Sequence, residues 1–254
     1  MKMTTVCAIV AGLITVVVAC AEPTLPAGAD PRQVAQELVE KLRSATPPEN
    51  THVTGVLKIL EKNSDMRVVP IEFEVKIEKD YWRAIYQTFM GTSAPPERAV
   101  IVHFRDRPNN YLFVRGSKYA EPKPLSRAEA TRPFGGSDFW LIDLGLDFLH
   151  WPVQRIIKTE MRKGRWCNVL ESVQSDPPAG SYARVVSWLD KETGGPILAE
   201  AYDAENKLLK EFSIKSIKKV EGEWQLKEME ISNVKTRSRT RLEFDLKVTA
   251  EASE

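Results

Sequence analysis

Cysteine is scarce in this chain, which has three cysteines in 254 residues. Cys7 and Cys20 lie within and at the end of an apolar N-terminal segment, so Cys167 has no cysteine partner in the remainder of the chain. An internal disulfide is therefore excluded for the domain that follows. Because residues 166–170 have the composition of a strand, we expect Cys167 to be a small buried apolar residue rather than a nucleophile.

An excess of charge of either sign is also lacking. The chain has 36 Lys and Arg against 35 Asp and Glu, which gives a formal net charge of +1. Loss of the first nineteen residues would remove only Lys2 and leave the two signs equal. A neutral protein has no electrostatic basis for binding nucleic acid, so we predict no nucleic-acid partner.

Familiar catalytic and metal-binding motifs are missing from the sequence. It contains no Gly-rich phosphate loop and no Gly-x-Ser-x-Gly elbow. Its three histidines, His52, His103 and His150, lie in separate segments without the close spacing of a zinc site. We therefore interpret each histidine as structural and predict no catalytic residue, no metal and no cofactor.

Three neighbouring aspartates, Asp138, Asp143 and Asp147, are the main argument for an enzyme. Paired carboxylates can act as acid and base in glycoside cleavage, and at helical spacing Asp143 and Asp147 would share one face. Helix capping by Asp138 and exposure of the other two to solvent explain these residues without catalysis. We favour this second interpretation and keep a hydrolase as the less favoured alternative.

The N-terminal segment has the pattern of an export signal. Lys2 is followed by an apolar, uncharged run from Val6 to Ala19, which is too short for a membrane-spanning helix of about 20 residues. We predict a signal peptide at residues 1–19, a tether at residues 20–29 and a single domain at residues 30–250, because this length suits one β domain. The mature protein is expected in the periplasm.

Two cleavage sites compete at the end of this signal. Val17-Val18-Ala19-Cys20 resembles the bacterial lipobox, in which the cysteine receives a diacylglyceryl group and becomes the first residue. Ala19-Cys20-Ala21 instead fits ordinary signal peptidase, which would cut after Ala21. The lipobox, which we favour, predicts a lipid on Cys20 that anchors the protein to the outer membrane, whereas the second site predicts a soluble protein.

A helix is expected directly after the tether. Asp30 can cap it and Pro31 suits its first position, while Val34, Leu38 and Leu42 recur at the helical period. This apolar face must pack against another element. Residues 46–48, Thr-Pro-Pro, end the helix.

From Thr51 the period changes to two, most clearly in residues 71–78, where apolar and charged residues alternate. Short polar turns join further segments of this kind, which indicates an antiparallel meander. An apolar stretch at 122–152 interrupts it, with helical patterns at 126–132 and 137–144. We predict a mainly β (α+β) fold in which a curved antiparallel sheet forms a half-open barrel covered on its concave side by short helices. The further strands are expected at residues 81–89, 98–104, 111–115, 153–163, 165–173, 182–190, 197–202, 208–220, 224–233 and 240–249.

The apolar faces of these elements suggest a hydrophobic ligand site. Burial of acyl methylenes contributes about 0.8 kcal/mol each, so an apolar cavity needs no directed polar contact to bind lipid. The same residues could instead pack against the covering helices, and the sequence leaves both interpretations open. The candidate cavity residues are Ile71, Phe73, Val75, Trp82, Tyr86, Phe139, Trp140, Val186 and Trp188.

Residues 134–244 carry a family resemblance in several short stretches that occur in order. These are Ser137-Asp138-Phe139 with Asp143-Leu144, Gly164-Arg165-Trp166-Cys167-Asn168-Val169-Leu170-Glu171, Trp188-Leu189-Asp190-Lys191 with Pro196, Tyr202-Asp203 with Leu208-Leu209-Lys210, and Trp224 with Met229-Glu230-Ile231 and Asn233. In them the chain resembles the periplasmic outer-membrane lipoprotein-sorting proteins of the LolA-like superfamily. The resemblance implies a curved sheet closed by helices around a cavity that shields acyl chains, without catalysis or cofactor.

The resemblance favours a non-enzymatic function, the periplasmic binding of lipoproteins or other acyl-bearing lipids for outer-membrane lipoprotein sorting. Two departures limit it: residues 30–118 match in pattern only, and a lipobox is unexpected in a freely diffusing carrier. A lipid-anchored envelope sensor or interaction protein of the same fold is therefore the alternative. The sequence favours neither a monomer nor a dimer.

Overall fold

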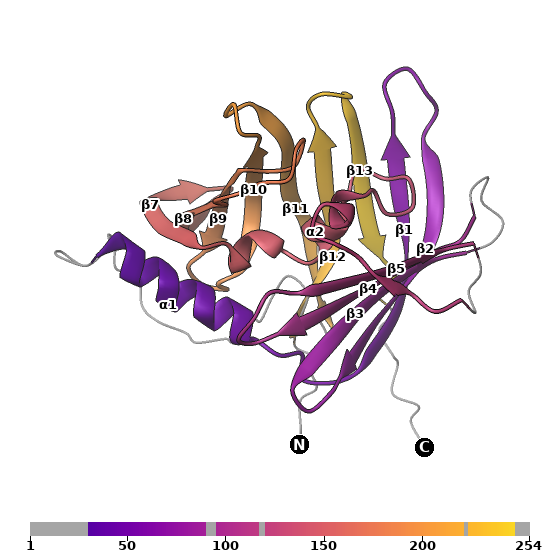
Figure 1. Ribbon diagram of the computed structural model, residues 1–254, viewed down its shortest axis with the longest axis horizontal. Helices are drawn as coiled ribbons and strands as arrows, with labels where there is room; N and C mark the ends of the chain where they lie inside the picture. Colours follow the sequence, from indigo (N-terminus) through magenta and orange to yellow (C-terminus); the bar gives the residue numbers. More distant parts are fainter. Residues whose placement is uncertain (1–29, 90–94, 117–119, 221–222, 247–254) are drawn as a thin grey trace.

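The computed structural model describes residues 30–89, 95–116, 120–220 and 223–246 (Figure 1). The predicted signal peptide at 1–19, the lipid attachment site Cys20 and the tether at 20–29 lie outside the described residues, as does the end of the strand expected at 240–249. Within the described part of the chain, no helix is long and apolar enough to span a membrane.

One antiparallel sheet dominates the structure and contains thirteen strands among the described residues. Its order is β6-β5-β4-β3-β2-β1-β13-β12-β11-β10-β9-β8-β7, so the first strand of the chain pairs with the last. The strands are β1 (Thr51–Leu60), β2 (Arg67–Ile77), β3 (Tyr81–Thr88), β4 (Glu97–Phe104), β5 (Asn110–Arg115), β6 (Lys123–Pro124), β7 (Val153–Arg162), β8 (Arg165–Val173), β9 (Arg184–Asp190), β10 (Pro196–Tyr202), β11 (Leu208–Val220), β12 (Glu223–Asn233) and β13 (Ser238–Phe244).

The pairing of β1 with β13 joins two meanders into one sheet. Gly55 lies opposite Phe244 in this register, and a Cβ atom on Gly55 would lie 2.4 Å from the carbonyl oxygen of Glu243. Glycine therefore permits the close approach of the two strands. The sheet stays open between its edge strands β6 and β7, which confirms the predicted half-open, curved antiparallel sheet.

The segment between β6 and β7 must cross the concave face, because these strands are the two opposite edges of the sheet. It contains the 3-10 turn η1 (Glu129–Thr131), helix α2 (Leu141–Leu144) and the 3-10 turn η2 (Asp147–His150), and α2 lies over the sheet in Figure 1. We call residues 133–152 the lid. The helix expected at 126–132 is limited to η1, since Pro133 disfavours helical geometry at the residue before it.

Helix α1 (Pro31–Ser44) forms as the sequence predicts. The Asp30 carboxylate accepts a hydrogen bond from the backbone N–H of Arg32 at 2.9 Å and so caps the helix. Ala35 and Val39 are buried, and they belong to the same apolar cluster as the inner side chains of the sheet. The helix packs against β7 and η2, so it covers the concave side next to the lid.

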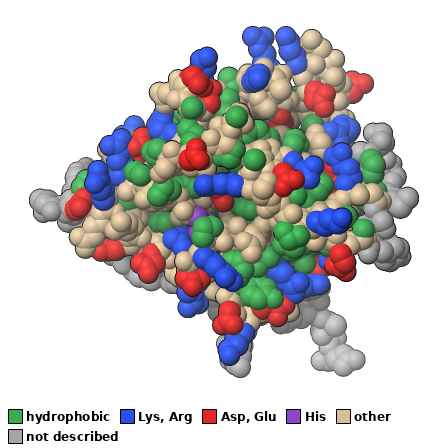
Figure 2. Space-filling view, in the orientation of Figure 1, with side chains coloured by type: hydrophobic (Ala, Val, Ile, Leu, Met, Phe, Trp, Pro, Cys, Tyr) green, Lys and Arg blue, Asp and Glu red, His purple; other side chains and the backbone are tan. Residues whose placement is uncertain are grey.

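A single large apolar cluster fills the space between the sheet, the lid and α1. Every second residue of the strands points into it, as the alternation at 71–78 predicts. On the face shown in Figure 2, acidic and basic side chains of the described residues are interspersed with hydrophobic ones. This face therefore has no patch of a single sign.

A second, small cluster lies on the convex side of β8 to β10 and corrects part of the sequence prediction. Val186 and Trp188 pack there against Cys167, whereas Val185 and Leu189 of the same strand point into the main cluster. Adjacent residues of a strand face opposite sides, so assigning Val186 and Trp188 to the concave face was wrong by one residue.

Cys167 is fully buried in this convex cluster, as predicted. Burial raises the pKa of its thiol to about 11, which disfavours the thiolate that nucleophilic chemistry needs.

Candidate functional site

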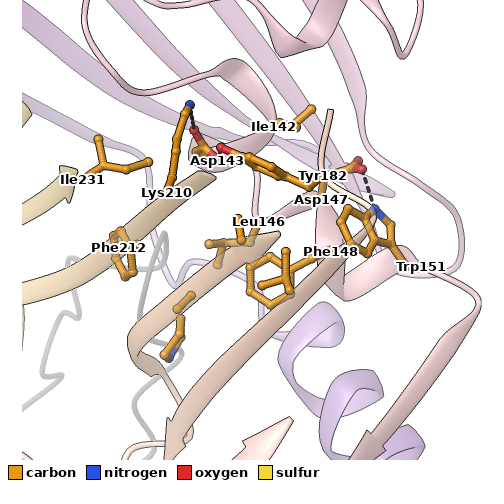
Figure 3. A pocket seen from close by; sticks show the side chains of 14 residues that line it. Ile142, Asp143, Leu146, Asp147, Phe148, Trp151, Tyr182, Lys210, Phe212 and Ile231 are labelled. Carbon is orange, nitrogen blue, oxygen red and sulfur yellow. Dashed lines mark hydrogen bonds and ion pairs between the residues drawn. The ribbon is translucent and has the colours of Figure 1, made fainter. Parts of the chain in front are cut away.

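The lid and the sheet enclose a small pocket near the middle of the concave face (Figure 3). Its free volume is about 40 Å³. This is room for very few water molecules and far below the roughly 300–1,000 Å³ of typical small-ligand pockets. In this structure the protein's own side chains therefore occupy the concave face. The lining residues are Ile142, Asp143, Leu146, Asp147, Phe148, Trp151, Tyr182, Val185, Pro196, Ala199, Ala201, Lys210, Phe212 and Ile231.

Aromatic side chains fill the half of the concave face formed by β1 to β5. The ring centroid of Phe73 lies 4.8 Å from that of Tyr86 and 5.5 Å from that of Phe244, and Phe134 of the lid meets Tyr86 edge-on at 5.9 Å. Phe139 is only 1% exposed. Of the candidate cavity residues, this cluster contains Ile71, Phe73, Val75, Trp82, Tyr86 and Phe139, and Trp140 packs against it partly buried.

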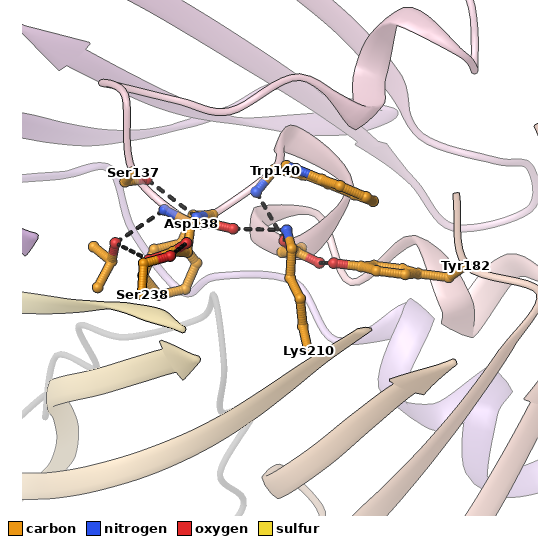
Figure 4. A network of polar contacts seen from close by, with 9 residues as sticks. Ser137, Asp138, Trp140, Tyr182, Lys210 and Ser238 are labelled. Carbon is orange, nitrogen blue, oxygen red and sulfur yellow. Dashed lines mark hydrogen bonds and ion pairs between the residues drawn. The ribbon is translucent and has the colours of Figure 1, made fainter. Parts of the chain in front are cut away.

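Lys210 of β11 is the centre of a buried polar network that holds the lid (Figure 4). Its side chain is 3% exposed, and its Nζ lies 3.1 Å from Oδ2 of Asp143. The ammonium also donates to the backbone carbonyl of Asp138 at 2.7 Å and lies 3.6 Å from the ring centroid of Trp140. Burial lowers the pKa of Lys210, while Asp143 acts in the opposite direction by favouring the charged form.

Asp143 connects this network to the loop before β9. Its Oδ1 accepts a hydrogen bond from the hydroxyl of Tyr182 at 2.9 Å, and its Oδ2 accepts one from the backbone N–H of Trp140 at 2.8 Å. The rings of Trp140 and Tyr182 stack with centroids 4.8 Å apart. We call the contacts of Lys210, Asp143, Tyr182 and Trp140 the latch.

Asp138 and Asp147 fix the two ends of the lid. Asp138 accepts hydrogen bonds from the hydroxyls of Ser238 at 2.5 Å and Thr240 at 2.9 Å, both on β13. Asp147 accepts hydrogen bonds from the hydroxyl of Tyr111 on β5 at 3.2 Å and from Nε1 of Trp151 at 2.9 Å. All these donors are protein groups, so these carboxylates act as structural anchors.

The roles expected of the three aspartates need correction. Asp138 does not cap a helix, since Asp143 accepts the N-terminal backbone N–H of α2 instead. Asp147 is buried, and the Asp143 side chain is only 12% exposed and pairs with Lys210, so neither is solvent-exposed as expected. Lys210 was missed among the candidate site residues because a lysine in an alternating strand is typical of the solvent-facing side.

Gly145 lets the lid approach β5 closely. A Cβ atom at this position would lie 2.5 Å from the hydroxyl oxygen of Tyr111. The side-chain amide of Asn109 donates to the carbonyl of Gly145 at 2.8 Å. The small residue therefore allows both Tyr111 and Asn109 to hold the middle of the lid.

The histidines differ in their surroundings. His103 is stacked on Trp82 with ring centroids 3.8 Å apart, and burial followed by the nearby His150 lowers its pKa to about 3. Burial and then Arg43 lower the pKa of His150 to about 4. Both therefore stay neutral in the folded state where an unfolded histidine, with a pKa near 6.5, would be protonated.

We expect the free energy of unfolding to decrease as the pH falls from 7 to 5. The unfolded state takes up protons below about pH 6.5 that the half-buried imidazoles of His103 and His150 do not bind, at a cost on the order of 2 kcal/mol for each by pH 5. Urea unfolding at pH 7 and at pH 5 measures this decrease in the free energy of unfolding. His103→Gln should remove roughly half of this dependence, since His150 remains, whereas the exposed His52→Gln should leave it in place. A wild-type stability that is equal at pH 7 and pH 5 would contradict the assignment.

His52 belongs to the one group of three potential metal ligands found among the described residues. Its ring lies on β1 with Glu72 and Glu74 of β2 beside it, all ligand atoms within 4.8 Å of one another. The imidazole is 55% exposed, and Glu74 already pairs with Lys76 at 3.0 Å. This open arrangement at the surface is a weak candidate for a cation and has no link to the lid.

Comparison with known proteins places the chain in a family. A family model described as "Uncharacterized protein" matches residues 102–252, more than half of the chain. The chain belongs to this family. The matched residues include the lid and β7 to β13, and hence every side chain of the latch. No curated protein matches the chain.

Solved structures identify the fold. A DUF1329 family protein from Desulfovibrio piger has a TM-score of 0.71 at 16% identity over 89% of this chain and 96% of its own. A domain described as an outer membrane lipoprotein-sorting protein, from Vibrio parahaemolyticus, has a TM-score of 0.67 at 19% identity, over 88% of this chain and 95% of its own. A LolA superfamily protein from Nitrosomonas europaea has a TM-score of 0.59 at 17% identity, over 86% of this chain and 93% of its own. The fold is therefore LolA-like, as the resemblance in sequence predicts, and at these identities the likeness shows the fold alone.

Proposed function

We propose that this protein binds the acyl chains of lipoproteins or of other acyl-bearing lipids against the concave face of its sheet, without catalysis, for outer-membrane lipoprotein sorting. The observation that carries the proposal is the arrangement of a continuous apolar concave face beneath a separate lid. The description of the Vibrio parahaemolyticus domain as a lipoprotein-sorting protein supports it.

Binding requires the lid to move, because the pocket of about 40 Å³ cannot hold an acyl chain. The latch combines the Lys210–Asp143 ion pair with hydrogen bonds, and the end anchors are hydrogen bonds. Each hydrogen bond contributes about 1 kcal/mol net, and more where one partner is charged. An acyl chain that buries ten methylenes gains about 8 kcal/mol, enough to offset several of these bonds. The exchange of lid side chains for lipid is therefore energetically accessible.

We further propose that the chain is exported, with a signal peptide at 1–19, a tether at 20–29 and one domain at 30–250. Lipid attached to Cys20 would hold the domain at the inner surface of the outer membrane, on the periplasmic side. The descriptions of the relatives as lipoprotein-sorting and LolA superfamily proteins support this location.

A second candidate function is that of a lipid-anchored sensor or interaction protein. The observation in its favour is the filled concave face, since a vestigial cavity would look like this. A hydrolase is less favoured because Asp138, Asp143 and Asp147 are all engaged by protein hydrogen-bond donors.

Weakening the latch should increase lipid binding. Tyr182→Phe removes the hydroxyl that donates to Asp143 but keeps the ring that stacks on Trp140, which lowers the cost of lid opening by about 1 kcal/mol. Titration with a fluorescent fatty acid should therefore show about fivefold tighter binding than in the wild type. Tyr202→Phe is the matched control, because Tyr202 donates to Glu200 and packs with the convex cluster.

Equal affinities of Tyr182→Phe and the wild type for the fatty acid would contradict a lid that competes with lipid.

Native mass spectrometry of the full chain extracted from cell envelopes tests the function itself. Release of an acyl-bearing ligand on collisional activation supports the carrier function. Protein without bound ligand in both the wild type and Tyr182→Phe favours the sensor function. The same spectrum shows whether Cys20 carries a diacylglyceryl group.

A further inference from the structure

A stripe of apolar side chains on β11 and β12 continues beyond the pocket under the lid. In the register of these strands Ile217 lies opposite Leu226, which belongs to the main apolar cluster. Directly opposite residues of an antiparallel pair share a face, so Ile217 also lies on the concave side. Trp224 precedes Leu226 by two positions on the same strand and shares this face. We call the concave apolar side chains of residues 212–217 and 224–231 the apolar stripe.

The exposure of the apolar stripe changes along its length. Ile231 lines the pocket under the lid and is 2% exposed, and Leu226 is 4% exposed. At the other end, Trp224 is 44% exposed and Ile217 is 38% exposed. The stripe therefore begins beneath the lid and ends uncovered next to the β11–β12 hairpin.

A groove of about 270 Å³ lies at this uncovered end. Ile214, Ile217 and Trp224 line it, together with residues of the β7–β8 and β9–β10 turns. Neither the lid nor α1 contributes to its lining. Pro196 lines both this groove and the pocket under the lid, so the two are adjacent. We call it the rim groove.

The charged side chains that line the rim groove are engaged by other protein groups. Arg165 pairs with Asp190 at 2.5 Å, and both line the groove. Lys215 pairs with a glutamate of β12 at 2.8 Å. Lys163 donates a hydrogen bond to the backbone carbonyl of Ile214 at 3.1 Å. The contacts that the rim groove offers to an occupant are therefore mainly apolar.

The length of the apolar stripe suits an acyl chain. From Ile231 to Trp224 it extends about 20 Å along β12, at about 3.3 Å per residue. The hydrocarbon core of a bilayer is about 30 Å thick, so the acyl chain of one leaflet spans about 15 Å. Part of such a chain can lie on the uncovered end of the stripe before the lid moves.

We propose that the rim groove is the entry site for the acyl chain. The part of the chain nearest the headgroup lies in the rim groove, and the methyl end continues along the apolar stripe beneath the lid. The proposal rests on the acyl-binding function above and specifies where the chain enters. Opening of the latch is then needed only for the methyl end of a long chain.

Isothermal titration of the full chain with tetradecanoic acid tests the entry site. Ile217→Asn should weaken binding about tenfold, the effect of about two methylenes that are no longer buried. Asparagine adds no charge that could repel the carboxylate of the ligand. Ile157→Asn is the matched control, because Ile157 is 42% exposed on β7 and does not line the groove, and it should bind as the wild type does. Urea unfolding checks that both variants keep the fold.

The chain length of the ligand separates the rim groove from the space beneath the lid. Decanoic acid should be sensitive to Ile217→Asn but not to Tyr182→Phe, because a short chain that enters at the rim does not reach the latch. Tetradecanoic acid should respond to both variants. A decanoic acid affinity that increases in Tyr182→Phe as much as that of tetradecanoic acid would place the short chain beneath the lid and overturn the entry site.

The remaining outcomes distinguish the entry site from acyl binding itself. Wild-type affinity of Ile217→Asn for tetradecanoic acid, or an equal loss in Ile157→Asn, overturns the rim groove and leaves acyl binding beneath the lid intact. Failure of the wild type to bind either fatty acid overturns acyl binding, and the entry site with it.

Discussion

Lys210→Met is expected to lower the free energy of unfolding by about 3–5 kcal/mol, because it leaves the carboxylate of Asp143 without its cation in a buried site. Methionine matches the four-atom aliphatic part of the lysine side chain, so the loss mainly reports the charge and its hydrogen bonds rather than a cavity. The carbonyl of Asp138 also loses a donor. Urea denaturation with an unchanged m-value measures the effect.

A lysine on the same strand provides the control. Lys215 pairs with Glu230 at 2.8 Å, but its side chain is 35% exposed, so Lys215→Met should cost less than about 1 kcal/mol. The double variant Lys210→Met, Asp143→Asn tests the mechanism. Its loss should be smaller than the sum of the two single losses, because the uncompensated charge is removed. Additive losses would show that Lys210 and Asp143 do not act as a pair.

The local structure could be predicted because its signals are local. The alternation in residues 71–78 and the cap formed by Asp30 and Pro31 each depend on neighbouring residues, and both are present in the structure. The antiparallel meander followed from the short turns. The LolA-like fold itself was recognised only through stretches after residue 134, where the family model also matches.

The site was less predictable because it depends on contacts between distant residues. Val186 and Val185 are equally apolar, and only the register of β9 decides which of them faces the lid. Lys210 meets Asp143 from 67 positions away, and nothing in its own strand marks it as buried. Whether the concave face holds a void is a property of shape, and here the lid fills it.

Phe139→Ala should have the second large effect, since it removes a lid side chain that is 1% exposed within the main apolar cluster. Loss of a buried phenylalanine costs about 3–5 kcal/mol and leaves an apolar void where the protein collapses only partly. Thermal and urea unfolding measure this loss. A loss below about 1 kcal/mol would show that Phe139 does not fill the concave face.

The same variant distinguishes a lid whose side chains occupy the acyl-binding site from a lid whose side chains only complete the hydrophobic core. A ligand that binds the folded state at a hundred times its Kd restores about 2.7 kcal/mol of stability. A fatty acid should therefore stabilise Phe139→Ala more than it stabilises the wild type, because the void beneath the lid is already open. Phe104→Ala, which truncates a buried ring packed on Tyr81 outside the main cluster, should lose stability without this gain. Equal stabilisation of the two variants would mean that acyl chains do not enter beneath the lid.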